Sequence, residues 1–519
     1  MPTRRLGAGS HQEPADRVTP RQMDTIQVIG APRVLPATPV LHRADHQGAH
    51  GGALEAARRL GPDGVVEHLA AAGLRGRGGA GFPTARKWAA VLGHEAPVAP
   101  PTVVVNAAEG EPGSFKDRAI LRRNPHAVLE GALVAATVIG ADRVVVALKR
   151  TFRTELGILE AAIRDWRKIA GGLGVEVLTF MGPSHYLYGE ETGLLEALEG
   201  RPPFPRVAPP YRHGVDEVGE PGSPQPAEVV MSDGTVAPPT LVSNVETFAN
   251  VPGILANGPA WFRQIGTVSS PGTLVATVTG ATRHAGVAEV PMGMPLQEAI
   301  ERIGGGAREG RRVVAAMSGV ANAVLTEDEL RTPLAYETME AVGSGLGAAG
   351  FVVFDDATDF AAVAAAASRF LAVESCGQCT PCKQDGLAVA RLLDGVRRSH
   401  AVDHDLVVLA ERLASITDGA RCSLATQHQR LVASIARSFG EELRAHVDGR
   451  RAGAAEYELA PIVELEDGAV VLDEHERAKQ PDWTYGDRDS GAAPAERLAT
   501  SRPAGERVDA DDLADLERD

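Results

Sequence analysis

The chain has 519 residues, of which 44% are hydrophobic and 23% charged, so we expect a large buried core and exclude wholesale disorder. Lys and Arg number 52 against 68 Asp and Glu, and the formal charge of -16 argues against nucleic acid as the main partner. No charge-free apolar run reaches about 18 residues, so we expect no transmembrane span. Arg4-Arg5 is not followed by an apolar region, so we expect no export signal. We expect a cytoplasmic protein, because free thiolates oxidise outside that reducing compartment.

The first half of the chain alternates helix and strand patterns. Residues 1–50 lack an apolar period and are predicted to be a mostly disordered leader, with a short ordered piece near 26–34. A helix is predicted over 51–72. β-Branched runs predict three strands, at residues 103–105, 143–148 and 175–180. Helical patterns separate them, at residues 117–140 and 155–170. The alternation predicts a parallel α/β sheet in a domain spanning 51–271, with a long Pro- and Gly-rich loop at 201–240.

The second half changes character twice. Residues 272–355 predict a small separate α+β domain with a helix over 296–303. Its expected strands lie at residues 273–279, 312–317 and 350–354. Residues 356–445 are predicted to be helical, and residues 446–519 to be a largely disordered tail that ends in an acidic run.

The four cysteines of the chain form one pattern. Cys376, Cys379 and Cys382 are spaced C-x2-C-x2-C, and Cys422 follows from a distant segment. Three thiolates at this spacing can hold one corner of a [4Fe–4S] cluster while the fourth ligand completes it. A zinc site more often uses two C-x2-C pairs, and buried free thiols remain the other alternative. The spacing favours the cluster.

A dense glycine run lies at residues 73–83, between two helical patterns. Glycines let the backbone approach a ligand closely, and their N–H groups beside a helix start can bind a phosphate. Arg77 and Lys87 could neutralise its charge. A flexible glycine loop without a ligand is the alternative interpretation.

Two acidic segments follow predicted strands. Residues 106–113 (NAAEGEPG) come after the strand at 103–105, and residues 186–192 (YLYGEET) come after the strand at 175–180. Ligands of open α/β sheets bind at the carboxyl ends of strands, so these segments suggest one cleft. Taken alone, Glu190 and Glu191 could simply be first-turn helix carboxylates.

These segments together resemble the NADH-binding, FMN-carrying flavoprotein subunit of respiratory complex I and the diaphorase subunits of NAD-linked hydrogenases and formate dehydrogenases. The resemblance covers residues 50–445 and is carried by five motifs. They are residues 73–83, 106–118, 189–200, 241–250, and 374–382 with Cys422. It implies a Rossmann-like FMN-binding domain, a β-grasp (SLBB-like) insert at 272–355 and a C-terminal helical iron–sulfur domain.

The resemblance also implies residue roles. FMN would contact Gly76, Arg77, Gly78, Lys87, Asn106, Glu109, Gly189, Glu190, Glu191, Val242, Ser243, Asn244 and Thr247. NADH would contact Gly79, Phe82, Glu111, Tyr186, Glu191 and Tyr211. Glu109 and Glu191 are the implied catalytic residues. Hydride would pass from the nicotinamide to the flavin, and electrons would then pass singly to the cluster and on to an iron–sulfur partner of thioredoxin or ferredoxin-like fold.

Three positions depart from the family pattern. Ala108 stands where the family usually has an acid, Ala208 where it has a basic residue, and Ala90 near a usual aromatic. The sequence therefore leaves a second function open: an electron-transfer or scaffold module that keeps the cluster, with or without FMN, and lacks nicotinamide binding.

Overall fold

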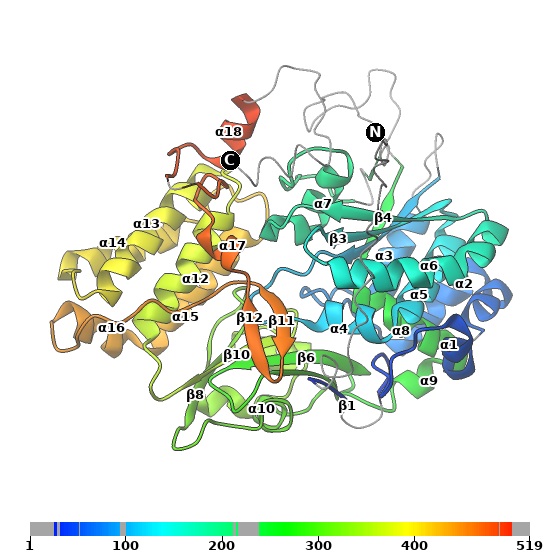
Figure 1. The fold of residues 1–519 in the computed structure, drawn as a ribbon, viewed down its shortest axis with the longest axis horizontal. Coiled ribbons are helices and arrows are strands. Elements are labelled where there is room, and N and C mark those ends of the chain that lie inside the picture. Colours follow the sequence, from blue (N-terminus) through cyan, green and yellow to red (C-terminus); the bar gives the residue numbers. More distant parts are fainter. Residues whose placement is uncertain are drawn as a thin grey trace, which may run out of the picture.

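The computed structural model describes residues 25–28, 32–50, 52–93, 100–210, 214–215, 238–486 and 488–500. Two sheets and a group of helices lie side by side in Figure 1, and an orange hairpin crosses the front between them. None of the helices in these described ranges combines the length and hydropathy that a membrane crossing needs.

A four-stranded parallel sheet forms the centre of the N-terminal part. Its strand order is β4-β3-β2-β5. The strands are β2 (Thr102–Ala107), β3 (Arg143–Lys149), β4 (Glu176–Gly182) and β5 (Thr240–Asn244). Alternate residues of β2 face two different cores, since Val103 and Val105 join one cluster and Val104 joins another. Burial of both faces explains why β2 and β3 are nearly continuous β-branched runs.

Helices cover both faces of this sheet. One layer contains α2 (Ala53–Ala72), α5 (Pro125–Ile139) and α8 (Val245–Asn257), which pack on one another, and α3 (Thr84–Leu92) lies beside α2. The helix predicted over 117–140 is two helices, α4 (Lys116–Arg123) and α5. Asn124 separates them and caps α5 by accepting the Ala127 N–H, and Pro125 takes the first helical position, where its missing N–H costs nothing. Helix α6 (Arg153–Leu173) joins β3 to β4, and α7 (Glu191–Leu198) covers the other face.

The second sheet has six strands in the order β1-β7-β6-β10-β8-β9. It contains β1 (Ile26–Val28), β6 (Thr273–Gly280), β7 (Gly286–Pro291), β8 (Val313–Ser318), β9 (Leu325–Thr326) and β10 (Gly350–Asp355), with α10 (Leu296–Gly304) packed on β6 and β7. The three predicted strands are present. The sequence prediction missed β7 and β9, and it did not foresee that β1 adds to the edge of this sheet.

The segment before residue 51 is more ordered than the predicted leader. Strand β1 pairs with β7 in parallel, and α1 (Arg43–His50) packs on α5 and α6. The buried carboxylate of Glu289 accepts the backbone N–H groups of Val34 and Leu35 at 2.9 and 2.7 Å. His46 contacts Glu130 at 2.7 Å inside the core. Long-range contacts of this kind leave no periodic pattern in the sequence.

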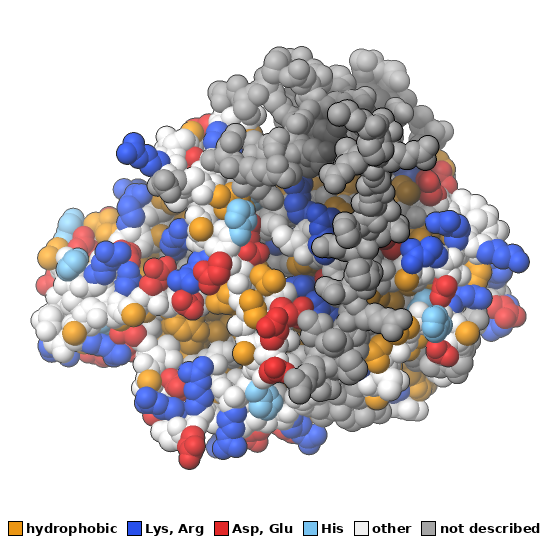
Figure 2. Space-filling view, in the orientation of Figure 1, with side chains coloured by type: hydrophobic (Ala, Val, Ile, Leu, Met, Phe, Trp, Pro, Cys, Tyr) orange, Lys and Arg blue, Asp and Glu red, His pale blue; other side chains and the backbone are white. Residues whose placement is uncertain are grey.

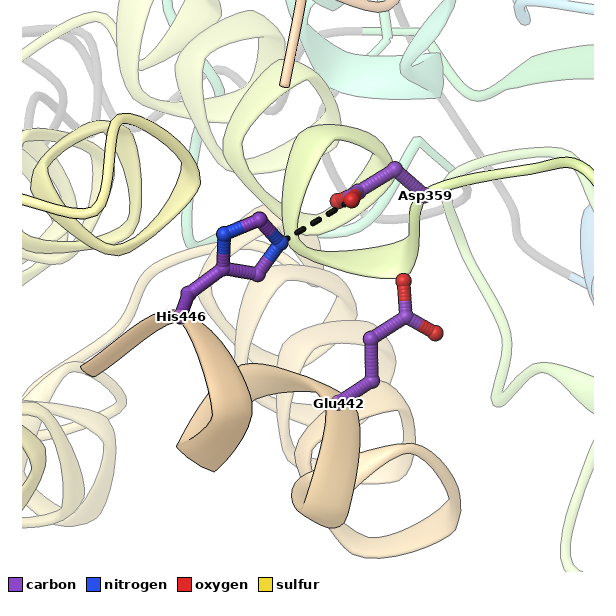
Figure 3. Close-up of side chains that lie close together, drawn as sticks. All are labelled: Asp359, Glu442 and His446. Carbon is purple, nitrogen blue, oxygen red and sulfur yellow. Dashed lines mark hydrogen bonds and ion pairs between the residues drawn. The ribbon is translucent and has the colours of Figure 1, made fainter. Parts of the chain in front are cut away.

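Five helices form the third part: α12 (Phe360–Glu374), α13 (Thr380–Arg397), α14 (Asp403–Ser415), α15 (Leu424–Ser438) and α16 (Gly440–Val447). Figure 2 shows acidic and basic side chains interspersed over the face of these helices. At the start of α12, Asp359 and Glu442 converge with His446, which contacts Asp359 at 2.9 Å (Figure 3). Arg451 bridges both carboxylates at 3.0 Å, so this cluster ties α16 to α12 as a set of ion pairs.

Residues 456–486 and 488–500, here called the C-terminal strap, are folded, although the sequence predicted a largely disordered tail. They contain β11 (Ile462–Glu466), β12 (Ala469–Leu472), α17 (Glu474–Ala478) and α18 (Pro494–Thr500). The strap contacts every part of the described fold. Arg122 of α4 donates two 2.7 Å hydrogen bonds to Glu464. Gly468 accepts the Ala285 N–H at 2.6 Å, and the indole N–H of Trp483 donates to the Val373 carbonyl at 2.8 Å.

Candidate functional site

The carboxyl edge of the parallel sheet gathers most of the predicted site segments. Strand β2 lies between β3 and β5, with Asn106 in register with Ala147 and Asn244. The Asn106 amide donates to the Gly189 carbonyl at 2.8 Å, which joins the two acidic segments. The structure therefore brings residues 106–113, 186–192 and the end of β5 to one edge.

The glycine loop folds back over this edge as a tight hairpin. The Gly76 N–H donates to Phe82 O at 2.8 Å, and Tyr336 from the six-stranded sheet domain donates its hydroxyl to Gly76 O at 2.7 Å. Gly81 has φ of 62°, and a Cβ there would lie 2.5 Å from the Tyr336 ring, so glycine is required. Within the described part of the chain, the N–H groups of Gly78 and Gly79 donate to no protein acceptor. They are free to bind an anion.

The side chain of Arg77 is turned toward protein carbonyl groups. Its side chain is 2% exposed, and the guanidinium donates to the carbonyls of Thr273 at 3.2 Å and Pro271 at 3.1 Å. Its backbone N–H donates to Thr247 Oγ1 at 2.9 Å. The Arg77 side chain thus fastens the glycine loop to the second sheet. Val242 is likewise fully buried in the core beneath the edge.

Lys87 and the two neighbouring glutamates lie at the rim. Lys87 forms an ion pair with Glu191, and their side chains are 24% and 42% exposed. Glu190 instead caps α7, because its carboxylate accepts the N–H groups of Thr192 at 3.0 Å and Gly193 at 2.8 Å. Burial raises the pKa of Glu190. The helix-terminus interpretation therefore describes Glu190, while Glu191 stays available with Lys87 to a ligand.

The side-chain carboxylate of Glu109 lies at the N-terminus of α4. Its carboxylate accepts the Ser114 hydroxyl at 2.6 Å and the backbone N–H groups of Asp117 and Arg118 at 3.3 Å. Burial, reinforced by the Asp117 carboxylate, raises the pKa of Glu109 to about 6. This carboxyl group can therefore change its protonation close to neutral pH.

Glu111 and Tyr186 connect the edge to the other two parts of the fold. The Tyr186 hydroxyl donates to Glu111 Oε2 at 2.5 Å, and the Val320 N–H donates to Glu111 Oε1 at 2.6 Å. Burial raises the pKa of Glu111, and burial together with Glu111 raises that of Tyr186 well above its ordinary value. The Tyr186 N–H donates to Glu374, at the end of α12, at 3.0 Å. Tyr186 is thus fixed from both ends.

Two buried lysines at the edge were not among the predicted site residues. Lys116 contacts Asp117 at 2.7 Å, Glu246 at 3.1 Å and Asn244 Oδ1 at 3.1 Å. Burial opposes its charge, but these carboxylates raise its pKa. Lys149, the last residue of β3, donates to the Ser184 carbonyl at 2.6 Å, and burial lowers its pKa. Both could have been found, since Lys116 lies within the motif at residues 106–118 and Lys149 directly follows the strand predicted over 143–148.

The remaining predicted residues fall in varied places. Phe82 is 48% exposed, so its ring is open to a stacking partner. Ala108 is buried at the edge, and Ala208 is partly buried. Ala90 lies on the exposed face of α3. Tyr211 lies outside the described residues. Ser243 is buried near the end of β5.

The four cysteines line one cavity between the α12–α13 loop and the start of α15. Cys376 and Cys382 are buried, Cys379 and Cys422 are partly exposed, and all four are free thiols. Protein groups point at the sulfurs: the Arg421 N–H lies 3.4 Å from Cys379 Sγ. Burial raises the pKa of Cys382 to about 11 and of Cys422 to about 12. Four convergent soft donors that need a positive partner to ionise fit an iron–sulfur cluster.

The cavity is close to the acidic segment at residues 186–192. Leu187, in the 3-10 helix η2 (Tyr186–Gly189), lines it together with the cysteines. Lys383 fixes the floor of the cysteine loop by donating to the carbonyls of Ala372 at 3.0 Å and Ser375 at 2.9 Å. One short segment, η2, therefore touches both the sheet edge and the cysteine cavity.

Comparison with known proteins agrees with this geometry. Residues 69–253 match the family model described as the Nuo51 FMN-binding domain, and residues 362–446 match the NADH-ubiquinone oxidoreductase-F iron-sulfur binding region. The second match selects an iron–sulfur cluster over the zinc and free-thiol alternatives.

Relatives cover most of the chain. The F 2 subunit of the NADH-quinone oxidoreductase of Rhizobium meliloti is 37% identical over 77% of this chain and 94% of its own length. The NADP-reducing hydrogenase subunit HndC of Solidesulfovibrio fructosivorans is 35% identical over 76% of this chain and 78% of its own length. A chain in the crystal structure of an NAD+-reducing [NiFe]-hydrogenase in the H2-reduced state superposes with a TM-score of 0.68 at 32% identity, over 81% of this chain and 68% of that one. The protein therefore belongs to the family of the F subunits of NADH-quinone oxidoreductase, with that family's FMN-binding domain and iron–sulfur region in one chain.

Proposed function

We propose that the protein is an oxidoreductase that takes electrons from NADH through FMN to one [4Fe–4S] cluster and passes them to a redox partner. FMN, when bound, accepts electrons in pairs from NADH and releases them singly, which a one-electron cluster requires. The observation that carries the proposal is the position of η2. Tyr186 reaches Glu111 at the sheet edge, and the next residue, Leu187, lines the cysteine cavity.

The glycine loop and the sheet edge are proposed to hold FMN. The unengaged N–H groups of Gly78 and Gly79 would bind its phosphate, with Lys87 supplying charge. Asn106 and Asn244 would hydrogen-bond the rest of the molecule from neighbouring strands. Backbone or packing contacts to FMN would come from Ser243, Gly76, Gly189 and Thr247. The Thr247 hydroxyl already accepts the Arg77 N–H.

The nicotinamide site is proposed to lie over this edge. Phe82 would stack on the donor, and Glu111 and Tyr186 would hold it at the side facing the cysteines. Glu109 and Glu191 are proposed to be the catalytic carboxylates. The raised pKa of Glu109 suits a group that holds a proton beside the reacting rings.

Finer assignments also belong to this proposal. Residues 272–355, which supply five strands of the six-stranded sheet, are proposed to be a β-grasp, SLBB-like domain, since helix α10 packs on β6 and β7. The electron acceptor is proposed to be an iron–sulfur protein of thioredoxin or ferredoxin-like fold. Free thiols in the described residues suit a reducing compartment such as the cytoplasm.

Anaerobic absorbance and EPR spectra before and after addition of NADH or NADPH test the function. The expected result is bleaching of the flavin absorbance, followed by the EPR signal of a reduced cluster. Protein loaded with FMN and iron that stays oxidised with both nucleotides would refute the proposal. That outcome would favour the electron-transfer or scaffold module, for which the missing polar groups at Ala108 and Ala208 provide the rationale.

A further inference from the structure

A line of buried polar contacts runs from the C-terminal strap into the proposed donor site. It begins at Lys479, which has no exposed surface and lies just after α17. Its Nζ lies 2.9 and 3.0 Å from the two carboxylate oxygens of Glu374, and 3.3 Å from Glu476 Oε2. A buried ammonium group needs such partners, and Glu374 is the one that the rest of the fold supplies.

Glu374 connects Lys479 to Tyr186. Its Oε2 also accepts the Tyr186 N–H at 3.0 Å, so one carboxylate binds the strap on one side and η2 on the other. The Tyr186 hydroxyl then donates to Glu111, whose second oxygen is held by the Val320 N–H. Each step is buried or partly buried, so water is a poor substitute for any of these partners.

Trp483 of the strap contacts the residues that precede Glu374 and Tyr186 in the chain. Its indole N–H donates to the carbonyl of Val373, the residue before Glu374, at 2.8 Å. Its ring stacks on His185, the residue before Tyr186, with centroids 4.1 Å apart. The strap therefore holds the neighbours of both residues that Lys479 connects.

We propose that Lys479 is a positioning residue of the donor site: it orients Glu374, which fixes Tyr186 and hence the Glu111–Tyr186 pair that faces the nicotinamide. The C-terminal strap is on this account part of the NADH-binding apparatus. The inference rests on the proposed function, because Tyr186 and Glu111 are assigned to the nicotinamide there. A strap that only added stability would leave the affinity for NADH unchanged.

Lys479→Met and Lys479→Arg in the full-length, cofactor-loaded protein test this inference. Met keeps the length of the side chain and removes the charge, whereas Arg keeps the charge. With ferricyanide as acceptor, Lys479→Met should raise KM for NADH by about tenfold, the effect of losing one charged hydrogen bond, with kcat within about threefold. Lys479→Arg should restore KM to within about threefold of the wild type. FMN and iron content should match the wild type in both variants.

Arg477→Met is the matched control. Arg477 is a strap residue whose ion pairs with Glu458 and Glu474 lie at the surface, and it makes the same change of charge. An unchanged KM in loaded Lys479→Met, or an equal rise in Arg477→Met, would overturn the proposal.

A second variant covers the case in which Lys479→Met does not fold because it leaves a buried carboxylate unpaired. Lys479→Met with Glu374→Gln removes both charges, so no unpaired charge is buried, and leaves a side-chain amide that no ammonium group orients toward the Tyr186 N–H. A raised KM in this loaded double variant supports the positioning role, and a wild-type KM refutes it. Failure of the proposed function itself would show separately, as wild-type FMN that NADH does not reduce.

Discussion

Replacing Gly377 by alanine should separate the cysteine loop from the C-terminal strap. Gly377 follows Cys376 and has φ of 82°, a conformation that costs an L-residue about 1–2 kcal/mol. A Cβ at this position would also lie 2.4 Å from the Cβ of Ala493, just before α18. Relieving that overlap by moving α18 or the loop costs about 1–3 kcal/mol more. Gly377→Ala should therefore lose about 2–5 kcal/mol of stability in total.

The steric part can be isolated with a second substitution. Ala493→Gly removes the atom that the new methyl group meets, so the double variant should recover the overlap energy and keep only the backbone strain. The measurement is the temperature at which the cluster absorbance is lost on anaerobic heating, for the wild type, both single variants and the double variant. In this double-mutant cycle, the expected coupling free energy between Gly377→Ala and Ala493→Gly is about 1–3 kcal/mol. If the two substitutions are additive within about 0.5 kcal/mol, α18 does not press on the cysteine loop and the reasoning is wrong.

Three further predictions concern other parts of the site. Cys379→Ser should abolish the cluster absorbance while FMN stays bound, as measured by iron content and flavin fluorescence after denaturation; loss of both cofactors would contradict the separation of the two sites. Because burial and Asp117 raise the pKa of Glu109 to about 6, the folded protein holds this proton more tightly than the unfolded chain, so stability contributed by Glu109 falls as pH rises from 4.5 to 6. Thermal midpoints of the wild type should therefore decline relative to Glu109→Gln across that interval, and parallel curves would show that the pKa is ordinary. Arg122→Lys should lose the paired hydrogen bonds to Glu464 and cost about 1–3 kcal/mol, seen as faster amide exchange in the β11–β12 hairpin; unchanged exchange would mean that other contacts hold the strap.

The parts of this fold that a sequence pattern can encode are local. The buried parallel strands could be predicted because β2 and β3 need apolar residues on both faces, which leaves continuous β-branched runs. The cysteine cavity could be predicted because spacing along one loop constrains where three of its ligands lie.

Long-range contacts account for what the sequence did not indicate. The direction of the Arg77 side chain is set by the carbonyls of Pro271 and Thr273, almost two hundred residues away in the chain. The strap has few apolar anchors, and Ile462, Leu465 and Trp483 are too widely spaced to produce a helical or strand period. Its order comes from partners in three other parts of the molecule, none of which is near it in sequence.

The strap also fixes an order of events during protein synthesis. Translation proceeds from the N-terminus, so Cys376 and Cys422 leave the ribosome before α18, whose Ala495 N–H donates to the Cys376 carbonyl of the cysteine loop. The nascent chain thus presents all four cluster ligands before the segment that covers Gly377 has been made. Until α18 has been made, the cysteine loop is therefore uncovered on the side of Gly377.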